Sequence, residues 1–361
     1  MAKRAATIID VAKAVGVSPS TVSHAISGKR EISIPVKERI FEKIRELDYR
    51  PSFFAQALKN SSTGLIGVVA NECRNPSAAM FIDALTAELE KFSYRPVVGL
   101  TGLNHEKGEE MLRRFSSGLV DGVINMLPQI APEEAQQLCG SVPVVTNIRE
   151  QLIPVWLDYN KLTLDILTYL WGMGHRKIGY ITSPLRMDRQ DTTVEVMAKF
   201  CADAGVEFSP EQVYEGDDTI ECGIAGAERI FRHGKVTAIF SGNDQMAFGV
   251  YRWAYRNGIR IPEDLSVIGF DDVPQAATII PPLTTVRFPV EEIVRHTVEL
   301  LVTKLNRRPL TPGRMTPEMP LVVRDSVADR TQEAHNRQYV KLHGTPVEPS
   351  NRLSAMHCIA A

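Results

Sequence analysis

The stretch VGVSPSTVSHAIS, Val15 to Ser27, carries the signals that begin and end a short helix. Ser18 can cap this helix with its side-chain oxygen, and Pro19 suits the first helical position, where no backbone N–H is needed. Gly28 follows the last turn and can end the helix, because glycine readily adopts a positive φ. The apolar side chains fall on one helical face: Val22, Ala25 and Ile26. The stretch therefore predicts a short helix that is closed at both ends.

Similar signals predict one helix before this one and another after it. Thr7 can form a capping box with Asp10, ahead of an apolar face that stops at Gly16. That face consists of Ile8, Val11, Ala12 and Val15. Ser33 is expected to cap a third helix that ends at Pro51. The third helix is expected to bury Ile40, Ile44 and Leu47. Two short helices joined by a turn of about three residues, with a third as support, form a helix-turn-helix.

The charges of the chain are unevenly divided. Residues 1–60 hold 11 Lys and Arg against six Asp and Glu, a net charge of +5, and the remainder holds 30 against 37, a net charge of −7. A basic module joined to an acidic body is typical of a nucleic-acid reader with a separate control domain. The small residues of the second helix would let it enter a major groove about 12 Å wide. The alternatives are a solvated helix surface and a small helical bundle that binds nothing.

The composition argues against secretion, a membrane span and a disulfide framework. Five scattered cysteines, odd in number and without a CxxC pair, favour a reducing cytoplasm and no zinc site. The N-terminus MAKRAATIID lacks the apolar core of a signal peptide. No run approaches the ~18 apolar residues of a membrane helix. We therefore expect a cytoplasmic location and no membrane partner.

Catalytic signatures are weak. The GMG at residues 172–174 follows a predicted helix and precedes a predicted strand, the wrong order for a dinucleotide loop. His105-Glu106 lacks the second histidine of a zincin, and no GxSxG motif or P-loop is present. Asp271-Asp272 could be a metal or acid pair, but at a strand end without a partner motif it favours ligand binding. We expect no enzyme, catalytic residue, metal or cofactor.

Residues 65–270 alternate short apolar segments with amphipathic ones. The apolar segments predict buried strands: LIGVVA (65–70), YRPVVGL (94–100), VDGVINM (120–126), VPVVTNI (142–148), KIGYIT (177–182), AIFSG (238–242) and LSVIGF (265–270). Helical segments between them imply crossovers and parallel sheets. The fold class is therefore α/β, with doubly wound parallel sheets in two halves that look like a periplasmic-binding-protein fold. In such folds a ligand binds at the carboxyl ends of the strands.

A family resemblance rests on blocks that occur in order over residues 7–326. They are IIDVAKAVGVSPSTVSHAISGKREIS, WGMGHRKIGYI, AIFSGNDQMAFG, IPEDLSVIGFDDV and PPLTTVRFP. Together they resemble the LacI/GalR family of bacterial transcriptional regulators. The resemblance implies a repressor that binds a near-palindromic operator of double-stranded DNA as a homodimer. It also implies control by a small-molecule effector between two lobes, and a segment, residues 284–305, that crosses back to the first lobe.

The resemblance assigns DNA contacts to the start of the first helix, to the second helix with the residues just after it, and to the hinge segment. Residues Phe53–Leu58 resemble the hinge helix of the family, with Leu58 as an apolar wedge in the minor groove; the alternative is an exposed apolar residue in a linker. His24 stands where the family usually has a base-reading arginine. The expected DNA-binding residues are Thr7, Ser18, Pro19, Ser20, Thr21, Ser23, His24, Ser27, Lys29, Arg30, Ala55 and Leu58.

The resemblance also assigns effector contacts: Asn71, Asn75, Asn147, Arg149, Arg189, Thr193, Asn243 and Asp271. Amides and carboxylates suit the hydroxyls of a sugar, although Asn243 could simply be a turn cap. Three positions depart from the family pattern, with Ile148 in place of Asp, Thr193 in place of Arg and Asp218 in place of an aromatic residue. Arginines near the cleft would suit a sugar acid or sugar phosphate, unless they lie on the surface: Arg74, Arg149, Arg186 and Arg189.

We divide the chain into four parts. Residues 1–51 are the helix-turn-helix domain, 52–64 the hinge and linker, 65–330 the effector-binding and dimerisation domain, and 331–361 a disordered tail without leucine heptads. A transport solute-binding protein would need a secretion signal and would leave the basic module unexplained. A two-lobed enzyme lacks a nucleophile or metal set. The regulator is the hypothesis that accounts for all parts.

Overall fold

The computed structural model describes residues 6–28, 30–50, 57, 62–102, 104–146, 155–182, 192–234, 236–310, 313 and 315–331. Its first elements are three helices, α1 (Ile8–Val15), α2 (Pro19–Ser27) and α3 (Ile34–Glu46). They pack around a shared core in which Val11, Val22 and Ile40 are fully buried. The predicted helix-turn-helix is confirmed.

The predicted caps explain where α1 and α2 begin and end. The Asp10 carboxylate accepts hydrogen bonds from the Thr7 backbone N–H and hydroxyl, at 2.8 and 2.7 Å. Ser18 accepts a hydrogen bond from the Thr21 backbone N–H at 3.1 Å. Gly16 and Gly28 follow the two helices with φ of 77° and 65°, in the left-handed region.

The end of α3 differs from the prediction. The helix stops at Glu46 rather than at Pro51, because Asp48 turns the chain with a φ of 44° and the Tyr49 N–H returns to the Ile44 carbonyl. Leu47 is consequently 39% exposed, and the prediction that it lies in the core was wrong. Tyr49 packs against the core instead. Ser33 occupies the N-cap position but makes no capping hydrogen bond with its side chain.

The first lobe is a four-stranded parallel sheet in the order β2-β1-β3-β4. Its elements are β1 (Leu65–Ala70), α5 (Pro76–Glu90), β2 (Arg95–Leu100), α6 (His105–Phe115), β3 (Gly122–Asn125), α7 (Pro132–Cys139) and β4 (Val144–Thr146). The central strand β1 is buried after its first residue, as expected for a parallel strand covered on both faces.

The second lobe is a six-stranded sheet in the order β10-β9-β8-β7-β5-β6, parallel except for the β9–β10 pair. Its elements are α8 (Tyr159–Gly172), β5 (Ile178–Thr182), α9 (Thr193–Asp203), η1 (Pro210–Gln212), β6 (Val213–Glu215), α10 (Ile220–Gly234), β7 (Ala238–Ser241), α11 (Asp244–Arg256), β8 (Ser266–Asp271), η2 (Pro274–Ala277), β9 (Thr284–Arg287) and β10 (Leu321–Val322). One core contains side chains of α8 and α9, the other those of α10 and α11. The doubly wound α/β class is confirmed.

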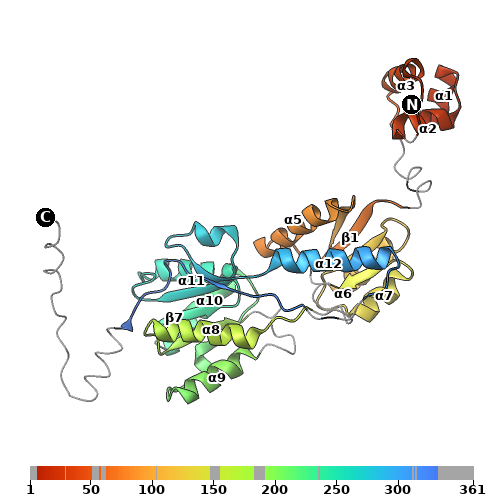
Figure 1. Ribbon diagram of the computed structural model, residues 1–361. Coiled ribbons are helices and arrows are strands. Elements are labelled where there is room, and N and C mark those ends of the chain that lie inside the picture. The colour runs from red at the N-terminus through yellow and green to blue at the C-terminus, as the bar shows by residue number, and fades with distance from the viewer. Residues whose placement is uncertain are drawn as a thin grey trace, which may run out of the picture.

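Helix α12 (Val290–Leu305) follows a strand of the second lobe but packs in the first, against α5 and the sheet (Figure 1). Leu301 lies so close to Gly122 that an added methyl group there would meet it at 3.0 Å. Phe288, just before α12, contacts Phe81 of the first lobe and Phe270 of the second, with ring centroids 5.9 and 5.7 Å apart. The crossing predicted for residues 284–305 is confirmed.

Contacts of Gly174 and His175 hold residues 328–331 against the start of β5. His175 is fully buried, with Nδ1 at 2.9 Å from the Thr237 hydroxyl and Nε2 at 3.2 Å from the Ala328 carbonyl. Gly174 has a φ of 84°, and a Cβ there would collide with the backbone of Arg330. The block WGMGHRKIGYI thus fixes the end of the body to its sheet. None of the helices in the described ranges is long and apolar enough to cross a membrane.

Candidate DNA-reading helix and effector site

Helix α2 presents a surface of small polar residues. Of its expected DNA contacts, Pro19, Ser20 and Ser27 are exposed, and Ser23 and His24 are half-exposed. The Ser18 hydroxyl lies 2.7 Å from that of Ser20 and also caps the helix. A surface of short side chains allows the helix backbone to approach the base edges closely, as a major-groove helix must.

His24 is held with one ring nitrogen inside the domain. Its Nδ1 atom is buried and has no hydrogen-bond partner among the described residues. A buried unpaired N–H is less tolerable than a buried lone pair. This arrangement therefore favours the tautomer with the proton on Nε2. Such a ring offers a single N–H donor, which suits the N7 and O6 acceptors of guanine.

The remaining DNA-contact candidates fall into two groups. The side chains of Thr7 and Thr21 are half-buried at the starts of α1 and α2, Thr7 within the capping box and Thr21 at 2.8 Å from the Ser18 hydroxyl. Arg30 is exposed just after α2. Lys29, Ala55 and Leu58 lie outside the described residues.

In the first lobe, the effector candidates follow strand β1. Asn71 accepts hydrogen bonds at its Oδ1 from the Gln129 amide at 2.9 Å and from the Thr101 hydroxyl at 3.3 Å. Asn75 caps helix α5 by accepting from the Ser77 N–H at 3.0 Å. Both side chains are half-buried beside the carboxyl ends of the strands, where parallel sheets bind ligands.

In the second lobe, Asn243 connects two loops at the same edge of the sheet. It is 3% exposed and caps helix α11, with its Oδ1 accepting from the Met246 N–H at 2.8 Å. Its Nδ2 donates to the Asp218 carboxylate, also at 2.8 Å. Asp218 has a φ of 67° in the loop between β6 and α10. Asn243 is therefore a helix cap, the alternative that the sequence left open. Asp218, which stands where the family usually has an aromatic residue, brings its carboxylate into contact with the Asn243 amide.

Asp271 and Thr193 differ in their surroundings. Asp271 ends β8, the neighbour of β7, and is half-buried with a φ of 114°. Thr193 is buried at the start of α9, and its hydroxyl lies 3.3 Å from that of Thr163 in α8. The structure therefore places Asn243 and Asp271 at adjacent strand ends, and Thr193 against a neighbouring helix.

The arginines proposed for an acidic effector receive little support from the part of the chain that the structure describes. Arg74 is exposed and paired with Glu72, its Nε lying 2.9 Å from the carboxylate. Arg74 is thus a surface arginine, the alternative that the sequence left open. The other three arginines lie outside the described residues: Arg149, Arg186 and Arg189. The same holds for two further positions of the predicted effector site, Asn147 and Ile148.

A cluster with metal-binding residue types occurs between α6 and α7. His105 Nδ1 lies 3.6 Å from the Glu109 carboxylate, and its Nε2 lies 3.3 Å from that of Glu134. The two nitrogens are on opposite sides of the ring, and Glu109 also pairs with Arg113 at 2.9 Å. These contacts link the two helices.

Comparisons with known proteins match both parts of the chain. Residues 7–52 match the model of the bacterial regulatory proteins of the lacI family, and residues 167–327 match a periplasmic binding protein-like domain. The chain is 31% identical over 340 residues to the HTH-type transcriptional repressor PurR of Pasteurella multocida (strain Pm70), covering 90% of this chain and 99% of that protein.

Two solved structures share the fold. One is a complex of the transcriptional regulator CelR with cellobiose, with 26% identity, a TM-score of 0.64, and coverage of 89% of this chain and 99% of that one. The other is the lac repressor dimer bound to operator and an anti-inducer, with 23% identity, a TM-score of 0.75, and coverage of 90% and 100%. With the helix-turn-helix ahead of a two-lobed body, the match of residues 7–52 and the 31% identity to PurR mean that the chain belongs to the lacI family of bacterial regulatory proteins.

Proposed function

We propose that the chain is a repressor that binds a near-palindromic operator as a homodimer and is controlled by a sugar or sugar derivative. The observation that carries the proposal is the surface of α2, with its capped ends, short hydroxyl side chains and half-exposed His24. A helix of this kind fits a major groove, and the excess of positive charge in residues 1–60 would neutralise phosphates.

A dimer is supported by two exposed apolar side chains. Tyr255 near the end of α11 is 88% exposed and Ile280 is 89% exposed. A hydrogen bond from the Tyr251 hydroxyl to the Pro281 carbonyl, at 3.0 Å, joins the two segments that carry them. Exposed apolar side chains on two joined segments suit a self-complementary contact between two copies of the chain.

The effector class follows from the groups at the strand ends. Asn71, Asn243, Asp218 and Asp271 offer carboxylates and amides, which hydrogen-bond to hydroxyl groups. Among the described residues, Arg74 is already paired with Glu72. A hydroxyl-rich effector therefore fits the described part of this region. In the proposed division, residues 1–51 bind DNA, 52–64 connect, and 65–330 bind effector and dimerise, with Arg189 beside the effector.

The test combines DNA selection with a ligand panel. The full chain should enrich a near-palindromic sequence from random DNA, with an affinity that falls steeply as salt rises. A chain lacking residues 1–60 should lose this binding. Both chains should be stabilised against heat by the same member of a panel of D-ribose, cellobiose, gluconate, glucose 6-phosphate and adenine. A compound at ~100 times its dissociation constant stabilises the fold by about 2.7 kcal/mol.

His24→Ala supplies the specificity control. Loss of the single N–H donor should relax the sequence preference at one base pair in each half-site, while binding to random DNA stays unchanged. DNA binding that does not depend on salt, or that survives without residues 1–60, would contradict the proposal.

A further inference from the structure

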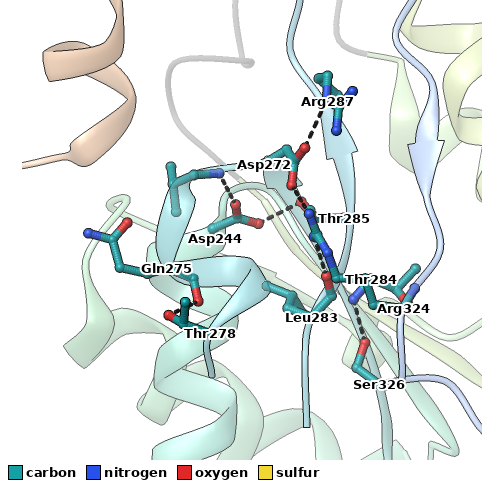
Figure 2. Close-up of polar contacts among 11 residues, drawn as sticks. Asp244, Asp272, Gln275, Thr278, Leu283, Thr284, Thr285, Arg287, Arg324 and Ser326 are labelled. Atoms are coloured by element: carbon teal, nitrogen blue, oxygen red, sulfur yellow. Dashed lines mark hydrogen bonds and ion pairs between the residues drawn. The ribbon is translucent and has the colours of Figure 1, made fainter. Parts of the chain in front are cut away.

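Next to the proposed effector residues lies a further buried carboxyl group. Asp244 is the first residue of α11 and is fully buried. Its Oδ2 accepts a hydrogen bond from the Val273 backbone N–H at 2.9 Å, and its Oδ1 accepts one from the Thr285 hydroxyl at 2.6 Å (Figure 2). One side chain thereby joins α11, the turn after β8, and β9.

The turn that Asp244 holds is strained. Asp271 and Asp272 have φ of 114° and 57°, two successive non-glycine residues at positive values. Such conformations cost free energy and persist only where the surroundings fix them. The Asp272 carboxylate accepts from Arg287 Nε at 2.8 Å and from Arg324 at 2.6 Å, and Arg324 also donates to the Leu283 carbonyl at 2.7 Å. Figure 2 shows these contacts on one side of the turn and Asp244 on the other.

Strand β8 is shaped to admit this carboxylate. A Cβ built at Gly269 would collide with Asp244 Oδ1 and would lie 3.2 Å from the Thr285 hydroxyl. Any residue other than glycine at this position would push the Asp244 side chain away from its donors. The glycine of the GFDD block is thus explained by the approach of Asp244.

We propose that Asp244 is a positioning residue of the effector site: it ties the Asp271–Val273 turn to the start of α11 and so fixes Asp271 relative to Asn243. Asn243 immediately precedes Asp244, and Asp271 immediately precedes the anchored Asp272. The inference rests on the proposed function, because it takes Asn243 and Asp271 as effector contacts.

The experiment compares full-length variants by hydrogen–deuterium exchange. Asp244→Ala removes both hydrogen bonds, and the amides of residues 270–276 should then exchange about tenfold faster or more. Asp244→Asn should exchange like the wild type, because its amide oxygen can accept from Val273 while its NH2 group donates to Thr285. Asp264→Ala is the matched control, since it removes a carboxylate paired with Arg260 on the surface of the same lobe. Exchange in α8 should be the same in all variants.

A milder variant protects the test against misfolding. Thr285→Val removes one of the two donors and should accelerate exchange in residues 270–276 by a few-fold. Wild-type exchange at these residues in both Asp244→Ala and Thr285→Val would overturn the proposal. So would equal acceleration in α8, because the effect would then be global.

Binding of the panel compounds separates this inference from the proposed function. The compound that stabilises the wild type most should bind Asp244→Ala at least about tenfold more weakly and should bind Asp244→Asn normally. Equal affinity for the wild type and Asp244→Ala would overturn the inference. No stabilisation of the wild type by any of the five compounds would count against the proposed function, and the exchange data would still decide whether Asp244 holds the turn.

Discussion

Asn243 and Asp244 are neighbours in the sequence with different surroundings. Asn243 caps α11 and contacts Asp218, whereas Asp244 turns inward and is covered by β8 and β9. Burial is the main reason that the pKa of Asp244 rises to about 7; the charge of Asp272 also raises it, while Thr285, Val273 and Arg324 lower it. Burial and, in turn, the charge of Asp244 raise the pKa of Tyr251. At this scale the environment, rather than the residue type, decides the chemistry.

Asp244→Asn is expected to change the pH dependence of unfolding. The folded protein keeps a proton on Asp244 up to about pH 7, whereas the unfolded carboxyl loses it near its ordinary pKa of 3.8. The contribution of this bound proton to the free energy of unfolding is fully present below pH 3.8. It is lost as the pH rises from there towards 7. The unfolding free energy of the wild type should therefore fall relative to Asp244→Asn between pH 4 and 7, by up to about 1.4 kcal/mol per pH unit. Urea titrations at a series of pH values measure this.

Asp264→Asn is the control with the opposite sign. Hydrogen bonds from Arg260 hold the pKa of Asp264 below its ordinary value, so its contribution is present above pH 4 and lost in acid. If the wild type and Asp244→Asn gave parallel profiles from pH 4 to 7, Asp244 would not hold the proton.

At the scale of elements, close backbone approaches fix how the segments join. The Gly174–His175 pair connects the end of α8 to residues 328–331, about 150 positions later in the chain, and thereby fixes the last described segment beside β5. Neither the apolar pattern of α8 nor that of β5 contains this information. The requirement for glycine arises only when the two segments meet.

Gly174→Ala should be far more destabilising than Gly205→Ala. Both glycines have positive φ, 84° and 67°, but only Gly174 faces a backbone that a methyl group would strike. Gly205→Ala, with open space around it, should cost about 1 kcal/mol for its backbone conformation alone. Gly174→Ala adds the collision with Arg330 and should cost about 3 kcal/mol or more. Chemical denaturation measures the free energy of unfolding of both variants. An equal decrease in the two would show that residues 328–331 can move away from Gly174 without cost.

At the scale of the whole molecule, two connected segments carry both the proposed effector contacts and the proposed dimer contact. Helix α11 begins beside Asn243 and carries Tyr255 near its end, and the loop after β8 follows Asp271 and carries Ile280. Phe288, packed between Phe81 and Phe270, connects the same lobe to the first one. The proposed effector contacts, dimer contact and lobe junction are therefore parts of one packed unit.

Tyr255→Asp and Ile280→Asp should convert the dimer to a monomer. A charge in a buried apolar contact has no partner and would oppose association. Sedimentation velocity should show the loss, and operator affinity should fall because two half-sites about 34–36 Å apart can no longer be bound together. Leu164→Asp, at a half-exposed leucine of α8, is the control and should remain dimeric. A dimeric Tyr255→Asp/Ile280→Asp double variant would place the contact elsewhere.

Local sequence patterns were sufficient to predict the short-range elements and the family. Caps, glycines and apolar spacing act within a few residues, and therefore Thr7, Ser18 and Gly28 predicted the boundaries of α1 and α2 correctly. The same rules failed at Leu47, because Asp48 turned the chain and Tyr49 filled the core. The sequence also gave Asn243 two alternatives, cap or ligand contact, without deciding between them.

Contacts between residues far apart in the chain became known only from the folded structure. Asp218 and Asn243 are 25 positions apart, and Asp244 and Thr285 are 41 apart. Spacing along a chain carries no information about such pairs, since crossovers and sheet order bring them together. The burial and raised pKa of Asp244 and the buried Nδ1 of His24 follow from what surrounds them. Local patterns thus specified the parts, and long-range packing set the chemistry of the proposed site.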